Sequence, residues 1–296
     1  MEVIHLLGKY EAFAKVVECG SLSAAADALG YTQSGISHMI SSLEASLGFR
    51  ILDRSRSGAA LTDSGRRIFP AVRAMLDNQE RLMQIVSEIH GLSAGTVRIG
   101  TFTSVAVHWL PEMIKEFGRD YPKIEFKLLS GDYSDVEGWL RSGDVDIGFV
   151  HMPTSEDYIC YPLAQDRLVA ILPPDHPLAK KDKFKVEAAA HEPFISLPES
   201  SAQDAVEALG AAGIKPDIKF TTKDDYALVS MVAHGLGISI VPELLISGRS
   251  DSLAALELDP PSSRTIGLAA RPEACSAPAT AKFIEYVRKW ASRRDP

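Results

Sequence analysis

Four hydrogen-bonding side chains lie near the start of the segment YTQSGISHMISSLEASLG, residues 31–48. Gln33 and Ser37 form one pair, and Ser34 and His38 form another, because residues four apart share a face of a helix. Short polar side chains on leading turns can approach base edges in the major groove, and glutamine can form two hydrogen bonds with adenine. We therefore expect this face to contact DNA in a sequence-specific way. The neutral surface of an ordinary core helix is the alternative.

The other side of the same segment predicts a buried stripe. Its apolar residues recur at steps of 3, 1, 3 and 4: Ile36, Met39, Ile40, Leu43 and Leu47. Thr32 is expected to cap this helix and Gly48 to end it. Ser21 or Ser23 can cap a short helix before it, and Gly30 permits a tight turn between the two. The pattern predicts a helix-turn-helix.

Residues 49–61 predict a small hairpin, or wing, with Arg54 and Arg56 beside a Ser-Gly turn. Arginines on a wing can contact phosphates or a minor groove. The net charge of −8 argues against nucleic-acid binding, but six arginines and two aspartates between residues 50 and 73 make this region locally positive. For each arginine a solvated side chain is the alternative, and for Arg73 we favour that alternative.

Residues 62–90 predict one long helix with a heptad seam. Apolar residues and one glutamine recur at alternating steps of 4 and 3: Ile68, Val72, Met75, Gln79, Leu82, Val86 and Ile89. Such a seam could pack on its own domain. Pairing two copies of the chain would instead double the length of DNA that one helix-turn-helix can read. We therefore expect a homodimer through this helix.

From Thr96 onward, strands alternate with helices, which predicts an α/β module after a flexible joint at residues 91–95. One series has strands at 96–102, 123–129 and 144–150, with helices at 104–119 and 132–141. A second series has strands at 166–172, 193–197, 217–222 and 237–241. A strand at 264–270 and a helix at 279–290 follow. Each series is too short for a large sheet, so we expect two small subdomains joined by crossing segments at 160–164 and 264–268.

A cleft between two such subdomains would bind a ligand where strands end and helices begin. The candidate effector-binding residues at these positions are Thr101, Thr103, Ser104, Ser130, Asp132, Phe149, Ser196 and Thr222. His151 follows the same strand as Phe149. Ser104 could hold a carboxylate at a helix N-terminus, whereas Asp132 beside an anion would be unfavourable. A simple helix cap without a ligand is the alternative for each hydroxyl.

We find no sequence signature of a catalytic, metal or cofactor site. Cys19, Cys160 and Cys275 lie far apart, which indicates reduced core residues. The match of residues 91–95 to the nucleophile elbow G-x-S-x-G follows a helix and precedes a strand, the reverse of what that elbow needs. The N-terminal segment does not have the pattern of a signal peptide, and no apolar stretch is long enough to span a bilayer. We expect a cytoplasmic protein.

The stretches GSLSAAADALGYTQSGISHMISSLEASLG and ILDRSRSGAALTDSG resemble the winged helix-turn-helix of LysR-type transcriptional regulators. Weaker similarity extends through residues 121–122, 143–149 and 175–179. Three positions depart from the family pattern: Gly35 replaces a usual alanine, His38 stands where arginine is common, and ILDR lacks the usual phenylalanine. The change at His38 puts in doubt which base or phosphate that position contacts.

The resemblance implies an all-α head followed by an α/β effector module like that of periplasmic binding proteins. The expected domains are a winged helix-turn-helix at 1–60, a linker or dimerisation helix at 61–92, and an effector-binding domain at 93–296. Within the last, subdomain one would comprise 93–162 plus 267–296, and subdomain two 163–266. The expected partners are double-stranded operator DNA, a small-molecule effector and further copies of the chain, as a homodimer or homotetramer.

In this interpretation the DNA-contacting residues are Thr32, Gln33, Ser34, Ser37, His38, Arg54 and Arg56. Effector binding would change the closure of the two subdomains and thereby the spacing of the DNA-binding heads. A transport-type solute-binding protein would share the cleft, and an enzyme could use it. The transport protein would need an export signal, and the enzyme would need an activated nucleophile, a base or a metal.

Overall fold

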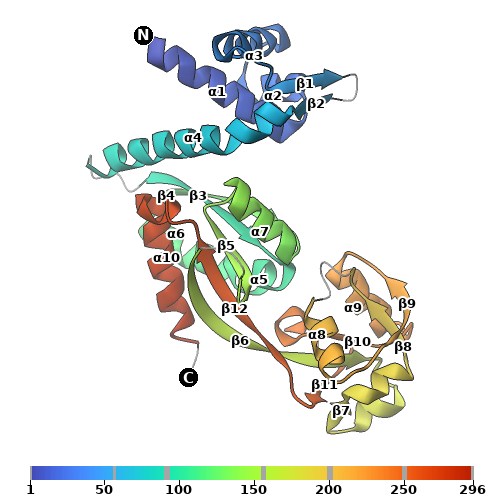
Figure 1. Ribbon diagram of the computed structural model, residues 1–296. Coiled ribbons are helices and arrows are strands. Elements are labelled where there is room, and N and C mark those ends of the chain that lie inside the picture. Colours follow the sequence, from blue (N-terminus) through green and yellow to red (C-terminus); the bar gives the residue numbers. More distant parts are fainter. Residues whose placement is uncertain are drawn as a thin grey trace. The chain divides into compact units, whose positions relative to one another are not determined.

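A computed structural model describes residues 2–55, 58–89, 94–154, 158–198, 203–248 and 252–294. The chain forms two compact units, Met1–Val86 and Ser87–Pro296. The order of elements confirms the predicted fold class, with a helical head, a long helix and a two-part α/β module (Figure 1). None of the helices in the described ranges combines the length and the apolar content that crossing a membrane requires.

The head consists of three helices and a hairpin: α1 Glu2–Cys19, α2 Leu22–Leu29, α3 Gln33–Leu47, β1 Leu52–Ser55 and β2 Gly58–Leu61. The predicted stripe of α3 forms part of the core, because Ile36, Ile40 and Leu43 are fully buried. They pack with Phe13 of α1 and with small alanines of α2. The alanines allow the helices to approach closely.

The turn between α2 and α3 is formed by the residues that the sequence indicated. Ser21 caps α2 by accepting a hydrogen bond from the Ala24 amide, and Gly30 ends α2 with φ of 70°, in the left-handed region. Thr32 caps α3, its hydroxyl accepting a hydrogen bond of 3.1 Å from the Gly35 amide. Gly48 ends α3 in the left-handed conformation. These caps fix where α3 begins and therefore which side chains occupy its first turn.

Arg73 differs from its sequence expectation, because it is buried rather than solvated. Only 8% of its surface is exposed, and its Nη1 donates a 2.8 Å hydrogen bond to Glu18 of α1. Burial opposes ionisation of Glu18, but Lys15 and Arg73 outweigh it and lower the pKa of this carboxyl. The arginine thus joins the long helix to the head.

Arg73→Met is expected to reduce the free energy of unfolding of the head by about 1–2 kcal/mol. Breaking a fully buried ion pair would cost more, but Glu18 is partly exposed. The pair contributes stability above the unfolded pKa of Glu18 and loses it as pH falls through the lowered folded value. Urea unfolding followed by circular dichroism should therefore show a smaller difference in stability between the wild type and Arg73→Met at pH 4 than at pH 7. Arg67→Met, at an exposed site of the same helix, is the control.

The long helix α4, Asp63–Ile89, has two distinct parts along its seam. Val72 is buried and Ile68 packs against the head core. Beyond them the seam is open to solvent, with Leu82 58% and Ile89 77% exposed. A regular apolar seam that the described residues leave exposed is typical of a helix that pairs with a partner.

The second unit is built on a sheet with the strand order β4-β3-β5-β12-β6-β11-β7, in which β6 is Ile159–Leu172, β7 Lys183–Lys185 and β11 Ala254–Asp259. Strands β3 (Ala94–Thr101), β4 (Lys123–Ser130) and β5 (Ile147–Met152) are parallel. Strand β12, Ser263–Ala270, runs antiparallel to β5. We call these four strands, together with the helices that pack on them, the first subdomain.

Helices cover both faces of the first subdomain. Helices α5 Thr103–His108, α6 Leu110–Asp120 and α10 Pro278–Ala291 share one core with β3, and α7 Tyr133–Ser142 packs on the other face (Figure 1). The predicted helix 104–119 is in fact two helices, because Trp109 interrupts it between α5 and α6. Asp132 caps α7, and its carboxylate and that of Asp135 form a reciprocal capping box.

The second subdomain gathers the remaining elements. Its strands are β7 Lys183–Lys185, β8 Pro193–Ser196, β9 Asp217–Thr221, β10 Ser239–Pro242 and β11 Ala254–Asp259, and its helices are α8 Gln203–Ala211 and α9 Asp225–Ala233. Strands β10 and β11 pair with β6, and β8 and β9 form a separate parallel pair. Short 3-10 turns lie at 177–180, 186–190 and 243–246, and a fourth, at 274–276, precedes α10 in the first subdomain. The sequence did not indicate β7 or β11.

Two long strands connect the subdomains. Strand β6, Ile159–Leu172, pairs with β12 in the first subdomain and with β10 and β11 in the second. Strands β6 and β12 contain the predicted crossing segments 160–164 and 264–268. Their pairing shifts register between Ile266 and Gly267. The two subdomains are therefore joined by paired strands rather than by loops.

Candidate DNA-binding face and effector cavity

The first turns of α3 present the predicted polar face. Gln33, Ser34 and His38 are exposed, and Ser37 is partly exposed. Thr32 is also exposed, and its hydroxyl lies 3.1 Å from that of Ser34. No acidic residue lies in the first turn of α3. The face is thus open and without negative charge, as contact with a base edge or a phosphate requires.

The wing is less completely described. The backbone of Arg54 pairs with Ala59 across the hairpin, whereas Arg56 lies outside the described residues. Two other arginines near the wing already have partners. Arg50 donates to the Leu52 carbonyl at 3.3 Å, and Arg66 pairs with Asp63.

A cavity of about 510 Å³ lies between the two subdomains of the Ser87–Pro296 unit. The ends of β3 and β4 and the starts of α5 and α7 supply its walls from the first subdomain. Helices α8 and α9 and residues after β10 supply the walls from the second. The volume suits a small organic molecule.

Four of the eight predicted effector-binding residues line this cavity: Thr103, Ser104, Ser130 and Asp132. The other four lie elsewhere. The Thr101 hydroxyl donates to the Phe102 carbonyl, and Ser196 donates to the Leu197 carbonyl. Thr222 accepts from the Asp224 amide, so it serves the cap of α9. Phe149 is fully buried in the core of the first subdomain.

The central side chain of the cavity is one that the sequence did not single out. Arg264, at the start of β12, is only 4% exposed. Its guanidinium binds Asp166 of β6 through two nitrogens, at 2.9 and 2.7 Å, and donates to the Ser104 hydroxyl at 2.8 Å. It also contacts Tyr133 of the first subdomain and Asp204 of the second. One buried cation thus contacts both subdomains.

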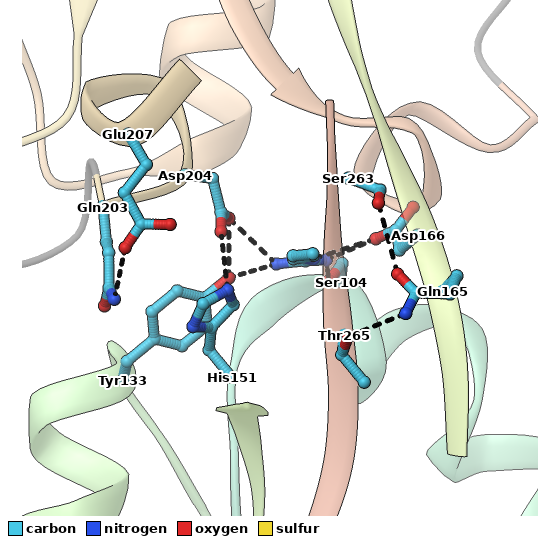
Figure 2. Close-up of polar contacts among 11 residues, drawn as sticks. Ser104, Tyr133, His151, Gln165, Asp166, Gln203, Asp204, Glu207, Ser263 and Thr265 are labelled. Carbon is cyan, nitrogen blue, oxygen red and sulfur yellow. Dashed lines mark hydrogen bonds and ion pairs between the residues drawn. The ribbon is translucent and has the colours of Figure 1, made fainter. Parts of the chain in front are cut away.

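Tyr133, Asp204 and His151 complete this network, and Figure 2 shows them close together. The Tyr133 hydroxyl donates a 2.7 Å hydrogen bond to Asp204, directly joining α7 to α8. His151 stacks on the Tyr133 ring, and its Nε2 lies 3.7 Å from Asp204. These contacts hold the two walls of the cavity together.

Burial shapes the ionisation of several groups in and behind the cavity. Burial raises the pKa of Asp166 above its usual range, although Arg264 acts in the opposite direction. Burial also raises the pKa of Asp225, which is hydrogen-bonded to Thr103. Desolvation raises the pKa of the Tyr133 hydroxyl, so this group is a neutral donor at physiological pH. Perturbed carboxylates grouped around a cavity are typical of a functional site.

A signal for Arg264 was present in the sequence. It begins the apolar run RTIGLAA, and a charge at the end of a buried strand needs a partner. Its partners Asp166 and Asp204 come from distant segments, so their identity could not be read from spacing. In the part of the chain that the structure describes, no three His, Cys, Asp or Glu side chains are arranged to hold a metal ion.

Residues 7–66 match the family model described as "Bacterial regulatory helix-turn-helix protein, lysR family", and residues 90–292 match the "LysR substrate binding domain". The chain belongs to the LysR family of transcriptional regulators. LysR proteins are regulators rather than enzymes, so the cavity is not an active site. This LysR chain is 34% identical over 282 residues to the HTH-type transcriptional regulator YvbU of Bacillus subtilis, covering 94% of this chain and 96% of that protein.

Solved LysR structures share its fold. A full-length OxyR variant from Pseudomonas aeruginosa has a TM-score of 0.76 at 21% identity, covering 96% of this chain and 94% of that one. Full-length CbnR, solved in complex with its target DNA, has a TM-score of 0.57 at 23% identity, with 96% and 99% of the two chains covered. The winged head and the two-subdomain module therefore follow the LysR architecture throughout the chain.

Proposed function

We propose that this LysR regulator binds specific operator DNA through α3 and its wing, under the control of a small-molecule effector in the cavity between its subdomains. The open, uncharged face of α3 supports the first part. The cavity, with walls from both subdomains, supports the second. We place this activity in the cytoplasm, as expected from the sequence.

In this proposal phosphate contacts position the head and base contacts specify the sequence. Arg54 and Arg56 of the wing, and Thr32 at the N-terminus of α3, would contact the DNA backbone. Gln33, Ser34, Ser37 and His38 would face base edges. CbnR is a LysR protein solved in complex with its target DNA, which supports DNA binding by this chain.

We further propose a homodimer through the exposed seam of α4, which can assemble into a tetramer. The apolar part of the seam, Leu82, Val86 and Ile89, is exposed within one chain. Gln79 within the seam would fix the register of the pair. Two heads on one dimer would then read two half-sites.

The effector would act by population shift. A compound that binds the closed and open arrangements of the subdomains with different affinity changes their ratio. The difference in affinity sets the coupling to DNA binding, and the coupling is reciprocal, so operator DNA should also change the affinity for the effector.

Gln33→Ala is expected to lower discrimination between operator and mutated operator by about 1–3 kcal/mol, because one bidentate base contact is lost. Arg54→Ala should weaken binding to all sequences and reduce the slope of log affinity against log salt by about 1. Fluorescence anisotropy with operator and scrambled duplexes at several salt concentrations measures both quantities. Equal behaviour of the two variants would contradict the assigned roles.

A further inference from the structure

The charge of the cavity is strongly unbalanced. Among its described lining residues five are acidic and two are basic: Asp132, Asp135, Asp204, Asp224 and Asp225 against Lys223 and Arg264. The acids come from the start of α7 in the first subdomain and from α8 and the start of α9 in the second. A bound carboxylate would meet like charges from both subdomains, which is unfavourable.

Arg264 cannot offset the repulsion between these acids and a bound anion, because its N–H donors already bind other side chains. A guanidinium has five N–H donors. Nε and Nη2 donate to Asp166, Nη2 also donates to Ser104, and Nη1 contacts Tyr133 and Asp204. A carboxylate could bind Arg264 only by displacing one of these buried partners. Ser104 is likewise engaged by Arg264, so the predicted carboxylate site there is weakened.

Asp204 has one carboxylate oxygen without a hydrogen bond from the described residues. Its side chain is only 9% exposed, and its Oδ2 accepts the hydrogen bonds from Tyr133 and Arg264. Its buried Oδ1 accepts no hydrogen bond from any residue that the structure describes, and His151 Nε2 is 3.7 Å away. A buried carboxylate that lacks one of its hydrogen bonds is costly, so a positive charge near Asp204 is favourable.

The acids of α9 point to the same chemistry. Asp224 caps the helix through Oδ1, which accepts from the amides of Tyr226 and Ala227 at 2.8 and 2.9 Å. Asp225 follows it directly in the sequence and lines the cavity with it. Two adjacent carboxylates repel each other, and burial raises the pKa of Asp225. A positively charged group between the α9 acids and Asp204 would reduce the repulsion between Asp224 and Asp225. It would also offset the cost of burying the Asp225 charge.

We propose that the effector is a small organic cation whose protonated amine or guanidinium group binds among Asp204, Asp224 and Asp225. This inference rests on the proposed function, because it names the ligand class of the same cavity. A cavity of about 510 Å³ is far larger than a metal ion needs. Its walls include Phe102, Tyr226 and Leu245, whose carbon atoms suit the carbon chain of such a cation.

The test uses the full chain in a buffer without primary amines. Agmatine and putrescine are the cationic probes, adipate is the matched dianion, and MgCl₂ is the inorganic cation. We expect agmatine or putrescine to raise the melting temperature in a saturable way, and adipate and Mg²⁺ to leave it unchanged. No shift with either amine, or a saturable shift with adipate or Mg²⁺, would overturn the cation class.

A substitution locates the site. Asp225→Asn keeps the shape of the side chain and removes its charge, and we expect it to weaken amine binding, measured by calorimetry, at least tenfold. Asp217→Asn, which removes an exposed charge paired with Lys219 in the same subdomain, should leave the affinity unchanged. Unchanged amine affinity in Asp225→Asn would contradict the assignment.

Operator binding separates this inference from the proposed function. If adipate binds the cavity and changes operator affinity, the cation class is wrong and effector control stands. If agmatine binds in an Asp225-dependent way but leaves operator affinity unchanged, the ligand class is supported and effector control is contradicted. Anisotropy with operator duplex, with and without each probe, distinguishes these results.

Discussion

Arg264→Met should reduce the free energy of unfolding of the Ser87–Pro296 unit by about 3–5 kcal/mol, because it leaves the buried carboxylates of Asp166 and Asp204 without their cation. Methionine fills a similar volume, so the loss reports charge and hydrogen bonding rather than a cavity. All three tryptophans, Trp109, Trp139 and Trp290, lie in this unit. Urea unfolding followed by tryptophan fluorescence therefore measures its stability directly.

Arg167→Met is the matched control. Arg167 is the next residue along β6 from Asp166 and forms a two-nitrogen ion pair with Glu243, but both side chains are exposed. Its loss is expected to cost at most about 1 kcal/mol. Similar losses in the two variants would show that burial of Arg264 contributes little.

The cost of Arg264→Met should also depend on pH. Without the arginine, burial raises the pKa of Asp166 further, so the folded variant binds protons more tightly than the unfolded chain does. The stability of the variant relative to the wild type is therefore recovered as pH falls toward the pKa of Asp166 in the unfolded chain. It is lost as pH rises through the pKa of Asp166 in the folded variant. The difference between the two proteins should therefore be smaller at pH 4.5 than at pH 7.5.

Leu82→Lys is expected to separate the proposed dimer and to weaken binding to a two-half-site operator by about 10²–10⁴-fold. A charge in an apolar seam opposes pairing, and a monomer loses the effective concentration that links two heads. Sedimentation velocity measures the assembly, and anisotropy measures operator binding. Binding to an isolated half-site should change little, because the head itself is untouched.

Met83→Lys is the control for this experiment. Met83 neighbours Leu82 on α4 and is equally exposed, at 61% against 58%, but it lies off the heptad seam. It should leave assembly and operator affinity unchanged. Dissociation by Met83→Lys, or an intact dimer with Leu82→Lys, would place the interface on another face.

The head could be predicted almost residue by residue because its determinants are local. Caps such as Thr32, turns such as Gly30 and the stripe of α3 act within a few positions, and the sequence shows their spacing directly. At Trp109 local spacing is not sufficient. The apolar periodicity continues through this residue, but the backbone divides into α5 and α6 there. Arg73 was placed wrongly because its partner Glu18 is 55 residues away.

The cavity was predicted only in outline. Thr103, Ser104, Ser130 and Asp132 were found because strand ends and helix starts mark the rim of an α/β cleft. The acids of the second subdomain were missed. Asp204 and Asp225 resemble ordinary acids at helix starts, and only the three-dimensional pairing with Arg264 and Thr103 distinguishes them.

The register shift between Ile266 and Gly267 gives the joined strands β6 and β12 a single irregular point. On either side of it the hydrogen-bonded ladder is regular, so each half is stiff, and an irregularity of this kind increases local bending and twist. Because β12 pairs with β5 on both sides of the shift, this bend belongs to the sheet of the first subdomain and curves β6 and β12 before they enter the second.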